Sequence, residues 1–166
     1  MENARWWHLV SGALTDVGEP RPDVVMDRLR QLSPAEIVEF ARLFSDVLDM
    51  AYLEPLWTAA GLIEGGCGDD GFRDFRAGLI LQGRAAFSAA VDDPDSLADL
   101  PLVRRMAEGS GRLGCAALLA APRTAYRELT GDVEAFDAAM APPVHPPSPP
   151  RGGPRALPRL TALFPD

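Results

Sequence analysis

Lysine is absent from this 166-residue sequence, and all 16 basic residues are arginine. The absence excludes Schiff-base chemistry and the lysine-dependent phosphate-binding loop. Histidine is scarce: His8 and His145 are the only two, and neither has the spacing of a zinc site or of a serine–histidine triad. We therefore predict no metal site, and no motif in the sequence indicates a cofactor.

Cysteine and long apolar runs are also scarce. Cys67 and Cys115 lie far apart, and the N-terminal residues lack the basic and apolar segments of a signal peptide. We expect both cysteines to be reduced and the protein to be cytoplasmic. No apolar stretch approaches the length of about 20 residues that spans a bilayer, so we expect no membrane association.

Charge is distributed unevenly along the chain. The net charge is −8, made up of −10 over residues 1–141 and +2 over residues 142–166. An acidic body without a clustered basic face argues against a nucleic-acid partner. The opposite charges of the two segments lead us to expect that Arg151, Arg155 or Arg159 docks on the body. Nothing in the sequence indicates the oligomeric state.

Helical periodicity and capping signals predict an all-α fold, a compact single-domain bundle of about seven helices. Ser33-Pro34-Ala35-Glu36 is a capping box followed by apolar residues at helical spacing to Ala51. No segment combines alternating apolar residues with β-branched residues, so we predict no strand. Further helices are expected over residues 6–14, 23–32, 55–64, 72–90, 95–100, 113–130 and 132–140. Within the helix over 72–90, Gly83 is expected to be a kink or a close-packing point, and Pro101 is expected to stop the helix over 95–100.

The composition changes abruptly after residue 141. Residues 142–155 contain seven prolines, which is typical of a polyproline II or disordered linker. In residues 156–166, four apolar side chains recur at helical spacing. The sequence therefore predicts a helical domain over 1–141, a proline-rich linker over 142–155, and a short C-terminal helix over 156–166 that docks on the domain.

The glycine-rich turn over residues 65–71 is the most distinctive polar feature. Its glycines allow close approach of a ligand, and Asp69 and Asp70 form a carboxylate pair beside Cys67. A simpler alternative is that Asp69 or Asp70 caps a helix that begins at Phe72, while Cys67 only fills space.

Three residues near this turn are further ligand candidates. Arg73 and Arg76 lie one helical turn apart and could face a carboxylate or phosphate, although pairing with Asp74 would serve equally well. Trp57 precedes the turn on the preceding helix, where an aromatic residue is commonly part of the core. Residues 109–114 match G-x-G-x-x-G, but no strand precedes them, so we interpret them as a loop.

The run from Trp57 to Leu100 resembles a bacterial domain-of-unknown-function family, number 4240. The matching segments are Trp57, Gly65 to Phe72, Phe75-Arg76, Leu79-Ile80, Gln82 to Arg84 and Asp93 to Leu97. The resemblance implies a compact, mostly helical, cytoplasmic bacterial protein whose biochemical role is not established. The chain departs from the family pattern at Glu64 (commonly asparagine), Gly68 (serine), Gly78 (tryptophan) and Ala116 (acidic).

Two functional hypotheses follow. The first is a module that binds a small ligand or a partner protein around the Cys67–Asp70 turn. Its candidate ligand-binding residues are Trp57, Cys67, Asp69, Asp70, Arg73 and Arg76. The alternative is a small cofactor-free accessory enzyme of a biosynthetic pathway, in which Asp69 or Asp70 is the acid/base and Arg73 or Arg76 clamps an anion. The residues alone leave open whether the protein is an enzyme, or whether the departures from the family pattern have removed a site.

Overall fold

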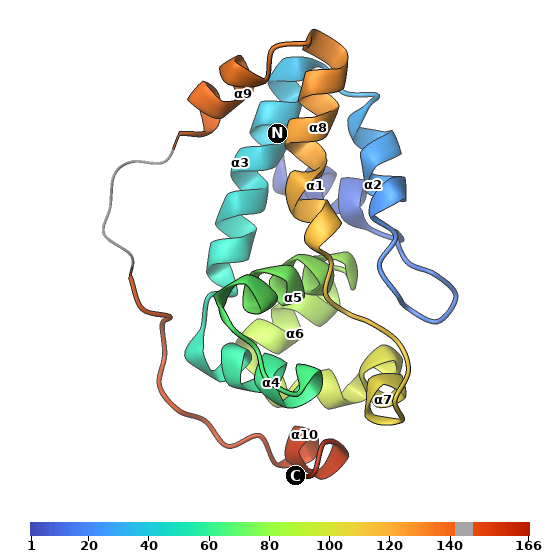
Figure 1. Cartoon of the computed structure of the whole chain (residues 1–166), viewed down its shortest axis with the longest axis vertical. Helices are drawn as coiled ribbons and strands as arrows, with labels where there is room; N and C mark the ends of the chain where they lie inside the picture. The colour runs from blue at the N-terminus through green and yellow to red at the C-terminus, as the bar shows by residue number, and fades with distance from the viewer. Residues whose placement is uncertain (142–147) are drawn as a thin grey trace.

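The computed structural model describes residues 1–141 and 148–166, and its regular elements over these residues are all helical (Figure 1). This confirms the predicted all-α class, with more helices than expected. In chain order they are α1 (Asn3–Val10), α2 (Pro22–Leu29), α3 (Pro34–Met50), α4 (Glu54–Glu64), α5 (Asp69–Leu81), α6 (Arg84–Asp92), the 3₁₀ helix η1 (Pro94–Asp99), α7 (Pro101–Ala107), α8 (Ala116–Thr130), α9 (Val133–Met140) and α10 (Pro158–Leu163).

The molecule has two ends that meet at α5. Helices α1, α2, α3, α8 and α9 form the upper end in Figure 1, and α4, α6, α7 and α10 lie at the lower end. Helix α5 packs against α3 and α8 on one side and against α4 and α6 on the other. Seven of its residues are buried, including Phe72, Phe75 and the run 77–81. Helix α5 is therefore the centre of the hydrophobic core.

The capping box at the start of α3 forms as predicted. The Ser33 hydroxyl accepts a hydrogen bond from the Glu36 amide, and the Glu36 carboxylate accepts one from the Ser33 amide at 2.8 Å. Both partners are within three residues of each other, so the contact depends only on local sequence. The cap of α9 is equally local, because the Asp132 side chain accepts from the Ala135 amide.

Several predicted helix boundaries were wrong. The N-terminal helix spans Asn3–Val10 rather than 6–14, α2 ends at Leu29 rather than 32, and α8 begins at Ala116 rather than 113. The expected helix over 72–90 is divided into α5 and α6, because Gly83 adopts a φ of +99° that ends α5 rather than kinking it. Helix α5 begins at Asp69 instead of Phe72. The short helix η1 ends before Pro101, as predicted, but Pro101 is also the first residue of α7, where its missing N–H leaves no intrahelical bond unmade.

Gly78 lies where the backbone of a distant loop touches α5. A Cβ atom at this position would lie 1.7 Å from the Leu113 carbonyl oxygen, which is far inside any real contact. One turn earlier, the Asp74 carbonyl accepts a hydrogen bond from the Cys115 amide at 2.9 Å. Residues 113–115 therefore rest directly on α5, and they could not do so if Gly78 carried a side chain.

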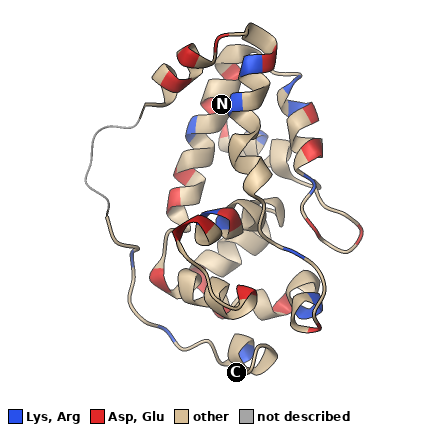
Figure 2. Cartoon of the chain, viewed as in Figure 1, with Lys and Arg blue, Asp and Glu red and all other residues tan. Residues whose placement is uncertain are grey.

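The C-terminal segment returns to the lower end of the body. Its arginines stand out against the mostly acidic body in Figure 2. The backbone of Arg151 pairs with the 52–54 segment, and its guanidinium contacts Asp49. Arg155 donates to the Asp92 carbonyl, and Arg159 forms an ion pair with Asp99. The proline-rich linker prediction lies partly outside the described residues, because 142–147, including His145, are not among them.

Asp95 fixes the start of α10 from outside that helix. Its side chain is buried and accepts hydrogen bonds from the backbone amides of Arg159 at 3.1 Å and Leu160 at 2.9 Å. No side chain within α10 caps its N-terminus, so Asp95 takes that role from η1. Leu157 and Leu160 are buried beside this contact. The C-terminal helix is thus held by both an apolar anchor and a buried carboxylate.

Candidate functional site

The turn between α4 and α5 is anchored to α4 by Trp57. Helix α4 ends at Gly65 with a φ of +71°, and Gly66 follows with a φ of +116°, conformations that favour glycine. The Trp57 indole N–H donates to the Cys67 carbonyl oxygen at 2.7 Å. Trp57 therefore positions the turn backbone, which is a structural role for this ligand candidate.

Arg76 is held within an aromatic stack. The Trp57 and Phe72 rings stack with centroids 4.9 Å apart, and the Arg76 guanidinium lies 4.7 Å from the Phe72 centroid and 4.9 Å from that of Tyr52. Arg76 also donates to the Leu48 carbonyl at 2.8 Å. Burial lowers the pKa of Arg76 below its ordinary value. This guanidinium joins α5 to the end of α3, and its contacts do not fit the expected role as an anion clamp.

Asp69 and Asp70 are both exposed in the first turn of α5. The N-cap residue is Gly68, which has no side chain to cap the helix, so neither aspartate is the cap. Their negative charges lie near the positive end of the helix dipole, where they stabilise α5. General acid/base chemistry by a carboxylate at neutral pH depends on a desolvated site. The exposed positions of this pair do not provide one.

A small cavity lies on the inner side of the same turn. We call it the turn cavity; its volume is about 170 Å³, and it is lined by Glu64, Gly66, Cys67, Gly71, Asp74, Arg112 and Gly114. Of the six ligand candidates predicted from the sequence, only Cys67 lines it. Arg73 lies instead beside a second cavity, formed with α3, α8 and α9.

The charged residues of the turn cavity were not predicted from the sequence as site residues. Glu64 closes α4, Asp74 lies on α5, and Arg112 belongs to the glycine-rich loop 109–114, which the structure confirms as a loop. Arg112 is distant in sequence from the turn and reaches it because residues 113–115 rest on α5. Only that long-range packing brings the three charges together.

Both thiols are weakly acidic in this environment. Burial raises the pKa of Cys67, and the carboxylates of Glu64 and Asp74 raise it further. Burial also raises the pKa of Cys115. Both cysteines are free. At neutral pH the Cys67 side chain is therefore a neutral thiol rather than a nucleophilic thiolate.

Two opposing effects act on the pKa of Glu64. Burial raises the pKa of its carboxyl group, and the positive charge of Arg112 partly offsets this rise. The turn cavity is thus lined by one arginine, two acidic residues and one cysteine. Within residues 1–141 and 148–166, no group of three or more His, Cys, Asp or Glu side chains is arranged to hold a metal ion.

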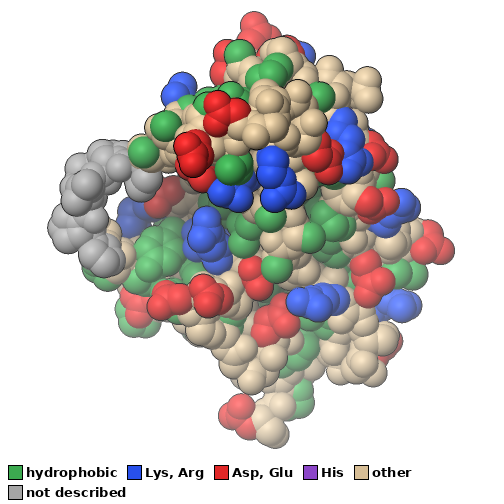
Figure 3. All heavy atoms as spheres, turned by 45° about the horizontal axis from the view of Figure 1, so that its top comes forward, with side chains coloured by type: hydrophobic (Ala, Val, Ile, Leu, Met, Phe, Trp, Pro, Cys, Tyr) green, Lys and Arg blue, Asp and Glu red, His purple; other side chains and the backbone are tan. Residues whose placement is uncertain are grey.

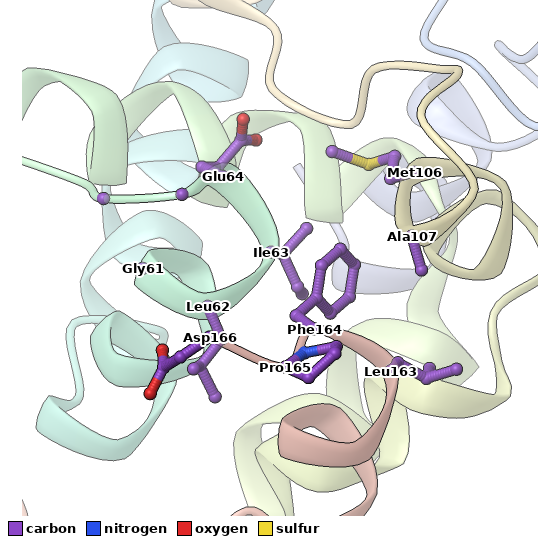
Figure 4. Close-up of a pocket in the computed structure, with 12 residues that line it drawn as sticks. Gly61, Leu62, Ile63, Glu64, Met106, Ala107, Leu163, Phe164, Pro165 and Asp166 are labelled. Atoms are coloured by element: carbon purple, nitrogen blue, oxygen red, sulfur yellow. The ribbon is translucent and has the colours of Figure 1, made fainter.

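A larger cavity, with a volume of about 690 Å³, lies beside the end of α4 (Figure 4). The end of α4 and the end of α7 form one side, and residues 163–166 form the other. In Figure 4 the Phe164 ring lies between Ile63 and the Met106–Ala107 segment, while the Glu64 and Asp166 carboxylates point away from it. Because the aromatic ring fills the middle, we interpret this space as a seam around the docked C-terminus.

One protein-family model matches most of the chain. The model of a family described as a protein of unknown function, DUF4240, matches residues 1–128. The chain belongs to this family. No curated protein and no solved structure matches. The DUF4240 region contains every residue of the turn cavity, whereas α9 and α10 lie beyond it. Among the described residues, no helix has the length and hydropathy needed to cross a membrane.

Proposed function

We propose that this DUF4240 protein is a binding module for a small zwitterionic molecule of amino-acid size, held in the turn cavity. The observation that carries the proposal is the pairing of opposite charges on the walls of a small space. Arg112 offers a guanidinium to a ligand carboxylate, and Glu64 and Asp74 offer carboxylates to a ligand ammonium group. A cavity lined by both signs favours a ligand that carries both signs.

The backbone around the turn cavity supports selective binding. Trp57 holds the Cys67 carbonyl, and the Cys115 amide ties the opposite wall to α5. Two walls of the cavity are therefore fixed before a ligand arrives, which reduces the entropy lost on binding. Gly66, Gly71 and Gly114 line the cavity without side chains, which leaves their backbone open to a ligand.

Ligand binding fits the geometry better than the alternative of an accessory enzyme. The proposed acid/base pair, Asp69 and Asp70, lies outside the turn cavity and is exposed. Cys67 lines the cavity, but its raised pKa leaves little thiolate at neutral pH. A protein-partner site around the turn has less support, because Met50 and Leu129 are the large exposed apolar side chains of the described part and neither belongs to the turn.

Thermal-shift measurements with a panel of free amino acids test the proposal. A ligand present at 100 times its Kd stabilises the folded state by about 2.7 kcal/mol. For a domain of this length, that corresponds to a Tm increase of roughly 5–10 °C. We expect at least one amino acid to produce such an increase, and its amine-only and carboxylate-only analogues to produce less.

Matched variants assign the effect to the turn cavity. Asp74→Asn and Arg112→Gln each remove one charge from the wall and should abolish the Tm increase. Asp70→Asn and Arg105→Gln remove the same charges from exposed positions outside the cavity and should preserve it. The proposal fails if no amino acid stabilises the wild-type protein, or if the increase survives in both cavity variants.

A further inference from the structure

A second cavity, separate from the turn cavity, lies at the other end of the molecule. We call it the arginine cavity; its volume is about 340 Å³. Helix α3 lines one side, α8 and α9 line the other, and Arg73 of α5 closes the end. Its lining residues are Ala41, Phe44, Ser45, Leu48, Arg73, Leu119, Pro122, Arg123, Phe136 and Met140.

The charge of this cavity is opposite to that of the chain. The protein has 24 acidic residues and a net charge of −8, yet the charged side chains lining the arginine cavity are two arginines and no carboxylate. Each of the four other cavities compared in the described part has at least one Asp or Glu on its wall. Figure 3 shows arginine side chains close to exposed hydrophobic side chains on one face of the molecule. The arginine cavity is thus a local positive site in an acidic molecule.

Arg73 is available to a ligand, whereas the neighbouring arginines are engaged. Arg123 forms a two-point ion pair with Asp137, and Arg76 is held by the Leu48 carbonyl and the aromatic stack. Arg73 is exposed and forms no hydrogen bond or ion pair with any described residue. The positive charges of Arg73 and Arg76 also repel each other, a cost that a bound anion would reduce.

The rest of the lining is apolar and held in place. Phe44, Leu48 and Phe136 are buried at its base, and Leu119 and Met140 are half-buried at its walls. Helix α9 is fixed to its neighbours by the Arg123–Asp137 ion pair and by the Arg42 guanidinium, which donates to the Ala139 carbonyl at 3.2 Å. Sites for drug-sized organic ligands, which are larger than a free amino acid, have this character: a preformed, mostly apolar cavity of at least about 300 Å³ with a few polar groups that orient the ligand.

We propose that the arginine cavity binds an amphipathic organic anion, a monocarboxylate with an apolar body, whose carboxylate pairs with Arg73. The apolar body lies against the Phe44, Leu48 and Phe136 side chains, and the Ser45 hydroxyl at the rim can donate to the carboxylate. A planar guanidinium and a carboxylate form two parallel hydrogen bonds, which selects a carboxylate over a neutral head group. The arginine cavity and the turn cavity have no lining residue in common. Two residues of the arginine cavity, Phe136 and Met140, also lie beyond the region that the family model matches.

Isothermal titration of the full chain with decanoate tests this site, with decanol as the neutral analogue of the same length. A hydrogen-bonded charge pair contributes enough free energy that losing it weakens binding by about 10- to 100-fold. We expect Arg73→Ala to weaken decanoate binding by this factor and to leave decanol binding unchanged. Arg105→Ala removes an exposed arginine of α7, outside this cavity, and should leave decanoate binding at the wild-type level.

A blocking variant tests the apolar part of the site without cutting into the core. Ser45 is exposed at the rim, so Ser45→Trp places a large ring over the opening and should abolish binding of both probes. Asp46→Trp adds the same ring to the next exposed position of α3, outside the lining, and should leave binding intact. The proposal is overturned if decanoate does not bind the wild-type protein, if decanol binds as tightly, or if Arg73→Ala or Ser45→Trp binds decanoate as the wild type does. Asp74→Asn should not affect this binding, so the result is independent of the turn cavity.

Discussion

Replacing Asp95 with alanine removes the carboxylate that caps α10 from the neighbouring helix η1. Asp95 is 6% exposed, and its two oxygens accept hydrogen bonds from the Arg159 and Leu160 amides. Losing a helix cap costs about 1–2 kcal/mol, and buried amides left without an acceptor add to that cost. We therefore expect Asp95→Ala to weaken docking of the C-terminal segment by about 2 kcal/mol, which is roughly a 30-fold increase in the undocked population.

Limited trypsin digestion measures this population, because trypsin cleaves after arginine and the segment contains Arg155 and Arg159. When opening is fast compared with cleavage, the cleavage rate follows the open fraction. Cleavage of the Asp95→Ala variant at these two sites, followed by mass spectrometry, should be roughly 30-fold faster than in wild type. Asp99→Ala is the control, because it removes only an exposed ion pair with Arg159 and should change the rate little. Equal rates for Asp95→Ala and wild type, or equal effects of the two variants, would refute the capping argument.

Three further substitutions test individual contacts of the fold: one on α5, one at the turn and one in the capping box of α3. Gly78→Ala should destabilise the protein by about 3 kcal/mol in urea unfolding, since its Cβ would overlap the Leu113 carbonyl; a change below about 1 kcal/mol would contradict the contact. Trp57→Phe keeps the ring but loses the hydrogen bond to the Cys67 carbonyl, so a loss of about 1 kcal/mol is expected in the same assay, and unchanged stability would show that the bond contributes nothing. Hydrogen bonds from Ser33 of the capping box and from the Arg5 guanidinium lower the pKa of Glu36 from 4.5 to about 2. A lowered carboxyl pKa stabilises the fold above pH 4.5 and loses that effect as the pH falls towards 2, so stability measured across this range should fall less steeply for Glu36→Gln than for wild type. The same dependence of stability on pH in Glu36→Gln and wild type would contradict this assignment of the Glu36 pKa.

Local contacts were readable from the sequence. The Ser33–Glu36 capping box and the Asp132 cap involve partners within three residues, and both form as their sequence patterns predict. The apolar stripe of α3 was equally clear, because helical periodicity identifies the buried face directly. These signals were sufficient for the all-α class.

Helix boundaries that depend on tertiary packing could not be predicted from the sequence. Gly83 could kink a helix or end it, and the sequence did not decide between these. Pro101 predicts the end of the helix before it, but proline also suits the first position of a helix, and α7 begins there. The departure from the family pattern at Gly78 has a structural reason, namely the Leu113 carbonyl against α5, which no local pattern contains.

The candidate site was located correctly only in part. The glycine turn was visible as a motif, and Cys67 does line a cavity there. Asp69 and Asp70 were predicted as site residues because they form a carboxylate pair in sequence. The charged residues that line the cavity come instead from three separate elements. Arg112 meets Glu64 and Asp74 only because the loop 109–114 packs against α5. Contacts of this kind depend on the whole fold.

The most direct test of the turn cavity is amide chemical-shift mapping by NMR. The full-length protein would be titrated with the amino acid that raises its Tm most. The account predicts the largest shifts at the amides of Gly66, Cys67, Gly71 and Gly114, which line the cavity. It also predicts that Arg112→Gln removes these shifts. Saturable shifts centred on other residues, or none at concentrations that stabilise the protein, would contradict it.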